Sequence, residues 1–415
     1  MRILIRLFTV FVVFILGACS NLISTPAPTP SATLTSYTFT PFLVPSPIST
    51  PSGIATSVPF FNSEVWTKGF GVNFTNQIND IVSDRLGNVY IACECATIEN
   101  SSGSYLAQAL LKYTGGGKLV WERSLEPSEG TAAYDAVATD SAGNIVITGE
   151  DVEFNGVIPT VNDLFIAKFD GDGYEAWKVT VAGGNTISGV VTDAQGNIYV
   201  TVDQRANPPL LRKYSPAGDL LWTRTLNSDL NSLTNKLVIG PDGHITVIGS
   251  LLGANVVILV QSYTPMGNVV WSNQFGSGND DFVEDAAIDD SGNIYVAYTN
   301  AGTHAVLEKY DASGTQLWAK ELDWSGNDNN TELIKLATNQ ENNLYILINH
   351  NWPLAPPSAE VLKMDASGDE VWTRVFPDYR QEIPEVIATD WNGSVYLAGT
   401  NYGDNQDIFL VKMQP

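Results

Sequence analysis

One ten-residue phrase recurs seven times in this chain of 415 residues. Its clearest copy is DDSGNIYVAY, residues 289–298, and the other copies begin at residues 83, 139, 192, 239, 338 and 389. The turn position of the phrase is occupied by Gly87, Gly143, Gly196, Gly243, Gly292, Asn342 and Gly393. Because these positions follow one another every 47 to 56 residues, the chain is built from one repeated supersecondary unit.

The phrase predicts a turn between two β-strands. Its Asp can accept hydrogen bonds from the backbone of the turn, and the Gly three residues later adopts a left-handed φ at no cost. After the turn, Ile198 and Val200 alternate with Tyr199 and Thr201, which is the period of a strand. A second phrase, KYDASGTQLW from Lys309, recurs with the same spacing and predicts another turn and a strand that carries a tryptophan. Each unit therefore holds four strands, here named a, b, c and d in chain order.

Seven such units predict an all-β fold, a seven-bladed β-propeller of four-stranded antiparallel blades. The sequence ends with DIFLVKM, which is a strand c without a following strand d. The repeated part begins with EVWTKGF, which is a strand d with nothing before it. We therefore predict that the N-terminal strand around Trp66 pairs with the C-terminal strand around Lys412 and completes the seventh blade.

Most positive charges belong to the repeat. A cation follows the strand-d tryptophan by two residues at Lys68, Arg123, Arg224, Lys320 and Arg374. Another cation ends strand c at Lys112, Lys168, Lys213, Lys309, Lys363 and Lys412. We interpret these side chains as structural, with the strand-d set protecting outer edges against strand-to-strand aggregation. A basic functional patch is therefore not expected.

The N-terminal residues predict an anchor and a tether. Arg2 and Arg6 precede an apolar run from Leu7 to Leu16, which is typical of a secretory signal. The LGAC sequence that ends at Cys19 resembles the lipobox of bacterial lipoproteins, which implies cleavage before Cys19 and acylation of its thiol. The alternative is an ordinary signal peptide with an accidental cysteine. Residues 20–60 hold eight prolines and sixteen Ser or Thr, a composition that favours a flexible tether.

The predicted order is thus a lipoprotein signal peptide (1–18), a lipidated cysteine with its tether (19–62) and the propeller (63–415). It implies a protein of the bacterial cell envelope that is lipid-anchored on the extracytoplasmic side of a membrane. The formal net charge is −24, and −26 without residues 1–18, because their two arginines are lost. Such a charge disfavours binding to nucleic acid. We expect a monomer.

Cys93 and Cys95 lie two residues apart on an expected strand. A bridge at this spacing is geometrically awkward, so small buried thiols are favoured and a disulfide remains the alternative.

The segment GSGNDDFVEDAAIDDSGNIYVAYT, residues 276–299, resembles the bacterial SBBP repeat, a seven-bladed β-propeller repeat of secreted proteins. The Asp-x-x-Gly-x-x-x-Trp phrase also resembles the quinoprotein-type repeat, whose family includes dehydrogenases and an outer-membrane assembly lipoprotein. Both resemblances imply the fold over residues 63–415, and the SBBP family is largely of unknown function. A quinone enzyme would be expected to show a vicinal cysteine pair, and Cys93-Glu94-Cys95 departs from that pattern.

No familiar catalytic pattern is present in the sequence. The histidines His244, His304 and His350 fall in three different units without metal-ligand spacing. The sequence DGDG at residues 170–173 suggests a calcium loop, but Asp170 and Gly173 are ordinary turn positions. We therefore predict a non-catalytic binding or scaffolding lipoprotein. The alternative is an extracytoplasmic enzyme, a carbohydrate-active hydrolase or lyase that uses carboxylates at the central mouth of the propeller.

One polar series points to the central channel. Five residues before the first position of each a–b turn stand Asn79, Asp135, Ser188, Asn235, Glu284, Ile334 and Glu385. If strand a is innermost, they ring one mouth of the channel, with Asp80 and Asp285 one residue further on, beside Lys236 and Lys335. A wet channel would explain this polarity. The sharper hypothesis is a site for Ca²⁺ or a cationic ligand, held by Asp80, Asp135, Glu284, Asp285 and Glu385. No other cofactor is expected.

Three tryptophans fall outside the repeat positions, in connections or turns: Trp324, Trp352 and Trp391. Trp324 and Trp352 are candidates for contact with a protein or carbohydrate ligand. The alternative is that each covers the edge of a blade.

Overall fold

The computed structural model describes residues 58–59, 64–70, 77–100, 103–124, 131–154, 159–204, 207–226, 232–252, 256–276, 281–300, 304–322, 331–350, 358–376, 382–401 and 408–414. All of them belong to one compact unit, residues 42–415. They form β-strands and turns without a helix. Accordingly, no helix suited to crossing a membrane is found among them.

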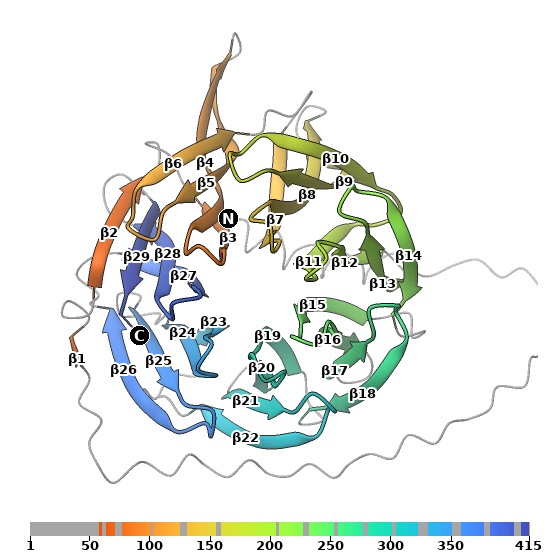
Figure 1. Cartoon of the computed structure of the whole chain (residues 1–415), viewed down its shortest axis with the longest axis vertical. Helices are drawn as coiled ribbons and strands as arrows, with labels where there is room; N and C mark the ends of the chain where they lie inside the picture. The colour runs from red at the N-terminus through yellow and green to blue at the C-terminus, as the bar shows by residue number, and fades with distance from the viewer. Residues whose placement is uncertain are drawn as a thin grey trace, which may run out of the picture. The chain divides into compact units, whose positions relative to one another are not determined.

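The strands form a ring of seven antiparallel blades, and strands a to d follow one another from the centre outward (Figure 1). Blade 1 contains β3 (Gln77–Ser83), β4 (Val89–Asn100), β5 (Gly103–Tyr113) and β6 (Leu119–Ser124). Blade 2 contains β7 (Thr131–Thr139), β8 (Ile145–Phe154), β9 (Pro159–Phe169) and β10 (Glu175–Val181). Blade 3 contains β11 (Thr186–Thr192), β12 (Ile198–Gln204), β13 (Asn207–Tyr214) and β14 (Leu220–Thr225). Blade 4 contains β15 (Ser232–Ile239), β16 (Ile245–Leu252), β17 (Val256–Tyr263) and β18 (Val269–Phe275).

The remaining blades repeat this order. Blade 5 contains β19 (Asp281–Ile288), β20 (Ile294–Asn300), β21 (His304–Tyr310) and β22 (Gln316–Leu322). Blade 6 contains β23 (Thr331–Thr338), β24 (Leu344–His350), β25 (Ser358–Met364) and β26 (Glu370–Phe376), with the short β1 (Val58–Pro59) added parallel to β26. Blade 7 contains β27 (Glu382–Thr389), β28 (Val395–Asn401), β29 (Ile408–Met413) and β2 (Glu64–Phe70).

Blade 7 closes the ring as the sequence predicts. The outer strand β2 pairs antiparallel with β29, and Trp66 lies opposite Lys412. Figure 1 shows β2, from the N-terminal part of the chain, outside the C-terminal β29. The innermost strands also contact one another all the way round, including β27 of blade 7 against β3 of blade 1. The fold class and the closure predicted from the repeats are confirmed.

The a–b turns have the predicted chemistry. In blade 1, Asp84 Oδ1 accepts the backbone N–H groups of Leu86 and Asn88, both at 2.9 Å, and its Oδ2 accepts the hydroxyl of Tyr90 at 2.9 Å. Gly87 takes a φ of 78° at the fourth position, and in the sixth unit Asn342 takes 59°. The Asp therefore satisfies the turn's backbone while the Gly supplies the left-handed conformation.

Lysines at the end of strand c link neighbouring blades. Lys168 Nζ lies 2.9 Å from Asp140 Oδ2 in its own blade and 3.4 Å from the carbonyl oxygen of Pro216 in the next one. Trp177 Nε1 donates to the same carbonyl at 3.1 Å. One backbone oxygen of each c–d turn is thus bound by side chains of the preceding blade.

The cations of strand d have a role that the sequence analysis did not predict. Arg123 Nε donates to the carbonyl oxygen of Gly173 at 2.8 Å, and Arg224 Nε to that of Gly267 at 3.1 Å. Both acceptors lie in the c–d turn of the next blade. These cations are structural, as predicted. Their observed role is to tie successive blades together, which is distinct from the protection of outer edges.

An arc of hydroxyl groups joins the inner strands just before the a–b turns. The hydroxyl of each residue donates to the carbonyl oxygen of its counterpart in the preceding blade, at 2.5 to 3.1 Å, in the pairs Ser83–Thr389, Thr139–Ser83, Thr192–Thr139, Thr338–Ile288 and Thr389–Thr338. Blades 4 and 5 hold Ile239 and Ile288 at this position, and an isoleucine side chain has no donor. The arc is therefore interrupted between blades 3 and 4 and between blades 4 and 5.

Cys93 and Cys95 form a disulfide, which corrects the favoured expectation of two thiols. The register between β4 and β5 shifts between Glu94 and Ala96, so Cys95 is the extra residue of a β-bulge. A regular strand would separate the two Cα atoms by about 6.6 Å, at roughly 3.3 Å per residue. The separation here is 5.4 Å, so the bent strand brings the two cysteines into bridging range.

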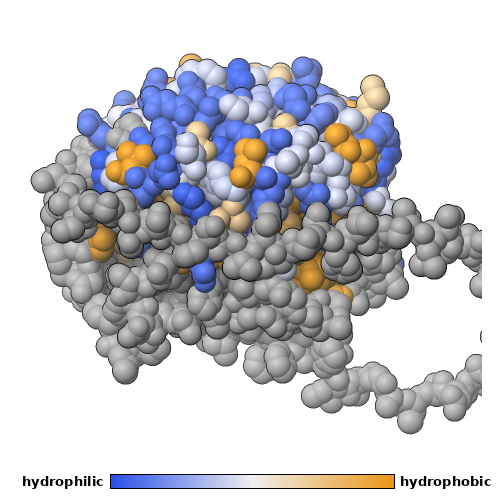
Figure 2. Space-filling model, turned by 90° about the horizontal axis from the view of Figure 1, so that it is seen from below, coloured by the Kyte–Doolittle hydropathy of each residue, from blue (hydrophilic) through white to orange (hydrophobic). Residues whose placement is uncertain are grey.

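Exposed hydrophobic side chains are spread around the rim. Val120, Leu221, Val270, Leu317 and Val371 precede the tryptophan of their strand d and are 44–52% exposed. Figure 2 shows separate hydrophobic spots with hydrophilic surface between them on the face in view. Single exposed aliphatic residues are normal on soluble proteins and carry no argument for a docking surface here.

Candidate functional site

The polar series predicted at the start of strand a is a series of β-bulges. In six blades the register between strands a and b shifts at the predicted residue, namely at Asn79, Asp135, Ser188, Asn235, Glu284 and Glu385. In blade 6 the shift lies earlier, between Thr331 and Leu333, and Ile334 is fully buried in the core. A bulge frees an extra residue from the ladder and redirects its side chain. Six of the seven predicted positions therefore coincide with a bulge in the backbone of strand a.

Four of the bulge residues, Ser188, Asn235, Glu284 and Glu385, have a hydrogen-bond partner on strand b that sequence reasoning missed. Ser188 Oγ donates to Asp203 Oδ2 at 2.7 Å in blade 3, and Thr299 Oγ1 donates to Glu284 Oε1 at 3.2 Å in blade 5. The partner stands seven residues after the turn position, where the seven units have Glu94, Glu150, Asp203, Ser250, Thr299, Asn349 and Thr400. All seven are polar, and this spacing was the signal that could have revealed them.

Asp80 and Asp285 occupy equivalent places and hold the next blade. Asp80 Oδ2 accepts the backbone N–H of Val137 at 2.9 Å, and Asp285 Oδ2 accepts that of Leu336 at 2.9 Å. Burial raises the pKa of Asp80, although Lys236 acts against the shift. These two predicted ligands therefore have a structural role in the contacts between blades.

The charged group of Lys236 lies 2.8 Å from Asp285 Oδ1 and connects blades 4 and 5 at the channel. Burial alone would raise the pKa of the Asp285 carboxyl, but Lys236 and Lys335 outweigh it and the pKa lies below its usual value. The Asp285 side chain is 3% exposed, whereas that of Lys236 is 37% exposed. Lys236 thus belongs to an ion pair with a buried carboxylate and still reaches water.

Glu284 and Glu385 are partly buried acids. Burial raises the pKa of both carboxyl groups, against hydrogen bonds from Thr299 and Thr400. Asp135, Glu284 and Glu385 belong to β7, β19 and β27, in blades 2, 5 and 7. Across the described ranges, no group of three or more His, Cys, Asp or Glu is arranged to hold a metal ion. The structure therefore gathers these acids on the same side of the blades but not at one point, and the cation site stays a prediction.

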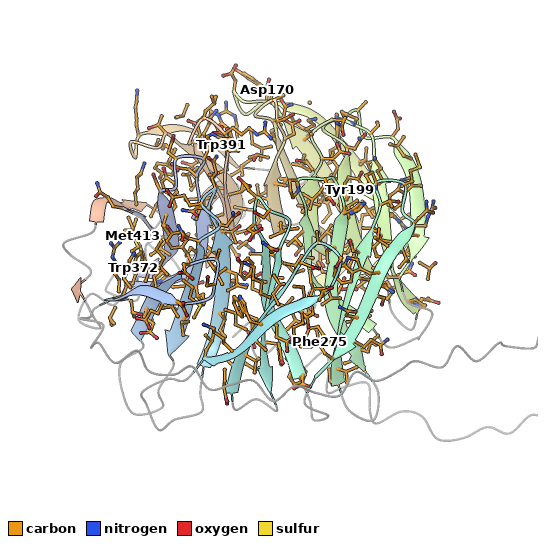
Figure 3. All side chains as sticks on the ribbon, turned by 60° about the horizontal axis from the view of Figure 1, so that its bottom comes forward. Asp170, Tyr199, Phe275, Trp372, Trp391 and Met413 are labelled. Atoms are coloured by element: carbon orange, nitrogen blue, oxygen red, sulfur yellow. A yellow bond between two sulfur atoms is a disulfide. The ribbon has the colours of Figure 1, made fainter. Side chains whose placement is uncertain are left out.

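The other candidates lie elsewhere. Cys19, Trp324 and Trp352 fall outside the described residues. Trp391 is 53% exposed in the a–b turn of blade 7, and the guanidinium of Arg85 lies 5.5 Å from its ring centre. Figure 3 places Trp391 and Asp170, both in turns, toward one end of the molecule and Phe275, which ends its strand d, toward the other. The bulges lie near the starts of the a strands, so the candidate mouth faces the Phe275 end.

Two long hairpins rise at this end. Strands β4 and β5 have 12 and 11 residues, and β8 and β9 have 10 and 11, whereas the b and c strands of blades 3 to 7 have six to eight. Both hairpins continue past Glu94 and Glu150, and Figure 1 shows the β4–β5 hairpin projecting beyond the ring. Blades 1 and 2 therefore make the candidate mouth asymmetric.

No family model matches the sequence, and no curated protein is significantly similar to it. Solved structures do match. A protein of unknown function from Dyadobacter fermentans is 9% identical, with 85% of this chain and 98% of that chain covered and a TM-score of 0.51. The Pan2 WD40 domain of Neurospora crassa is 8% identical, with 84% and 96% covered and a TM-score of 0.51. A polysaccharide lyase of family PL25, an ulvan lyase, is 9% identical, with 83% and 95% covered and a TM-score of 0.48.

At these identities the two likenesses above a TM-score of 0.5 are evidence for fold alone. In fold, the chain is a β-propeller of seven four-stranded blades.

Proposed function

We propose that this protein is a non-catalytic binding or scaffolding protein of the bacterial cell envelope, and that its ligand enters the channel mouth where the strand-a bulges lie. One observation carries the proposal. Lys236, whose ammonium pairs with the buried Asp285, has a side chain that is 37% exposed. Water therefore reaches charged groups of the inner strands, and a ligand of suitable size can follow.

The residues around this mouth favour a positively charged ligand group. The bulge positions and their strand-b partners include six acids and no cation, namely Glu94, Asp135, Glu150, Asp203, Glu284 and Glu385. Lys236 and Lys335 stand one residue further along the inner strands, where Asp80 and Asp285 oppose them. Carboxylates at an opening attract cations and suit Ca²⁺ as oxygen ligands. We propose Ca²⁺, or an ammonium or guanidinium group on a ligand, as the bound species.

Calcium-dependent melting tests the cation. Wild type, the mouth variant Asp135→Asn/Glu284→Gln/Glu385→Gln and the control Asp172→Asn/Glu175→Gln/Glu370→Gln would be compared with and without CaCl₂ or MgCl₂. The control removes the same charge from exposed residues at the opposite end of the blades. A ligand that binds the folded state raises the melting temperature by mass action, so wild type and control should shift and the mouth variant should not. Equal shifts in all three would refute the mouth, and no shift in any would refute the cation.

The membrane part of the proposal is supported by Cys19 and the tether composition. Two acyl chains give stable attachment, so Cys19→Ala should move the folded protein from the membrane fraction to the soluble fraction. Ser20→Ala is the matched control and should stay with the membranes. A Cys19→Ala protein that still sediments with membranes would contradict the lipid anchor.

A further inference from the structure

A buried carboxylate lies at the contact between blades 4 and 5, away from the channel mouth. Glu308 on β21 is 4% exposed. The hydroxyl of Tyr298 on β20 donates to Glu308 Oε1 at 2.9 Å, and the hydroxyl of Tyr310 donates to Oε2. Phe275 of blade 4 packs on both tyrosines, with ring centres 5.7 Å from Tyr298 and 5.5 Å from Tyr310. The carboxylate thus lies behind aromatic rings that join the two blades.

The groups that face Glu308 do not balance its charge. They are Tyr298, Tyr310, Gln316 on β22, and Asp281 on β19, and none of these four is a cation. Asp281 is itself fully buried. By contrast, the turn carboxylates Asp140, Asp193, Asp289 and Asp390 each have a lysine within 4 Å. Burial raises the pKa of Glu308, and the negative charge of Asp281 raises it further, against the hydrogen bonds of the phenols.

Blade 5 is exceptional at this position. Glu308 stands two residues before the end of strand c. In blades 1 to 7 this position holds Leu111, Ala167, Arg212, Gln261, Glu308, Leu362 and Val411. The neutral counterpart is Gln261 in blade 4, whose Oε1 accepts the hydroxyl of Tyr263 at 2.6 Å. The fold therefore accommodates a Gln–Tyr pair where blade 5 has an acid, so stable folding alone does not require the ionisable group.

The other polar links of the same contact lie at the channel and at the c–d turn, away from Glu308. Ile288 interrupts the arc of hydroxyl groups between blades 4 and 5, so the inner strands lack the bond that most other blade pairs have. Lys236 and Asp285 supply an ion pair at the channel. At the c–d turn of blade 5, Trp271 and Asn273 of blade 4 donate to the carbonyl oxygens of Ala312 and Gly314. Between these links lies the apolar cluster around Val260, Val296 and Tyr310. A negative charge on Glu308 is therefore opposed by burial and stabilised only by the hydrogen bonds that Tyr298, Tyr310 and Gln316 make to it.

We propose that Glu308 makes the contact between blades 4 and 5 a protonation-controlled joint, which is closed when the carboxyl group is neutral and loosens when it ionises. The proposal stands independently of the channel ligand. The fold favours the protonated form, so its contribution to stability is complete below the ordinary Glu pKa of 4.5 and is lost as the pH rises through the raised value.

Melting curves of wild type and Glu308→Gln between pH 4 and 8 test the joint. Gln keeps a hydrogen-bonding group of the same shape, as Gln261 does in blade 4. Above pH 4.5, wild type should lose on the order of 2 °C relative to Glu308→Gln for each pH unit, until the raised pKa is passed. The exposed Glu175→Gln is the control and should run parallel to wild type. A constant difference between wild type and Glu308→Gln would overturn the proposal.

Two further measurements locate the effect. In an infrared difference spectrum between wild type and Glu308→Gln, the band of a protonated carboxyl group should persist above pH 4.5, and a midpoint at or below that value would overturn the proposal. Hydrogen exchange, corrected for its intrinsic pH dependence, should speed up in β17 and β19 of wild type as the pH rises, and not in β3 and β7. A uniform increase in all four strands would also contradict a local joint.

Discussion

At the scale of single residues, the glycines of the c–d turns meet two requirements at once. Gly314 has a φ of 83°, which favours glycine by itself. A Cβ built on Gly314 would also lie 2.6 Å from Trp271 of the preceding blade, because this tryptophan lies across the turn and donates its Nε1–H to Ala312 at 2.9 Å. The sequence predicts the first requirement from turn chemistry. The second requirement depends on a tryptophan of the neighbouring blade, so the sequence does not predict it.

We predict that Gly314→Ala destabilises the protein more than Gly143→Ala. Gly143 has nearly the same φ, 80°, but nothing within 4 Å of a built Cβ, so it isolates the backbone cost of about 1–2 kcal/mol. Gly314→Ala should add about 1–3 kcal/mol for overpacking against the indole ring. Denaturant unfolding of both variants measures the difference. Equal losses would mean that the tryptophan moves aside freely.

At the scale of strands, counting from the turn located the bulges because that distance is constant in six units. Glu284 and Glu385 each lie five residues before the turn Asp, at the register shift. The count failed for Ile334, since the shift in blade 6 comes earlier and leaves this residue in the ladder opposite Ile348. Hydrogen-bond partners that lie on another blade could not be predicted. One example is Thr234 of blade 4, which donates its backbone N–H to Asp203 of blade 3 at 3.1 Å.

The arc of hydroxyl groups gives a prediction at this scale. Thr139→Val keeps the shape of the side chain but removes the donor to the carbonyl oxygen of Ser83, which is 3.1 Å away. The loss should be about 1 kcal/mol of unfolding free energy, the typical net value of one hydrogen bond. Thr139→Ser should retain most of the stability, because Ser83 fills the equivalent position in blade 1. A Thr139→Val protein that is as stable as wild type would show that this hydroxyl contributes nothing to the contact between the blades.

At the scale of the whole molecule, the number of blades and the closing pair were predictable because the repeat phrases count the blades and the incomplete first and last units complement each other. The distribution of charge in the channel was not predictable from the sequence. Lys236 and Asp285 belong to different units, and only the ring brings them to 2.8 Å. The sequence places Lys236 and Lys335 at the same step of the repeat as Asp80 and Asp285, but it does not show which of these charges pair. The disulfide between Cys93 and Cys95 was only the alternative expectation for a similar reason, since the bridge depends on a bulge.

Closure itself can be tested by removing residues 408–415. This segment contains β29 (Ile408–Met413), the third strand of blade 7, which pairs with both β28 and β2. The side chains of Ile408, Phe409, Leu410, Val411 and Met413 are at most 2% exposed.

Burial of five such side chains contributes on the order of 10 kcal/mol, at about 1.5–3 kcal/mol each, which is comparable to the whole stability of a typical domain. The loss also leaves β2 without its partner and β28 as an open edge. We therefore expect the truncated chain to aggregate or to melt far below wild type. Removal of residues 1–59 is the control, because the only part of this segment that the structure describes is β1, which pairs at two positions of β26, and it should change the melting temperature little. A chain without residues 408–415 that melts within a few degrees of wild type would show that this strand does not hold the ring closed.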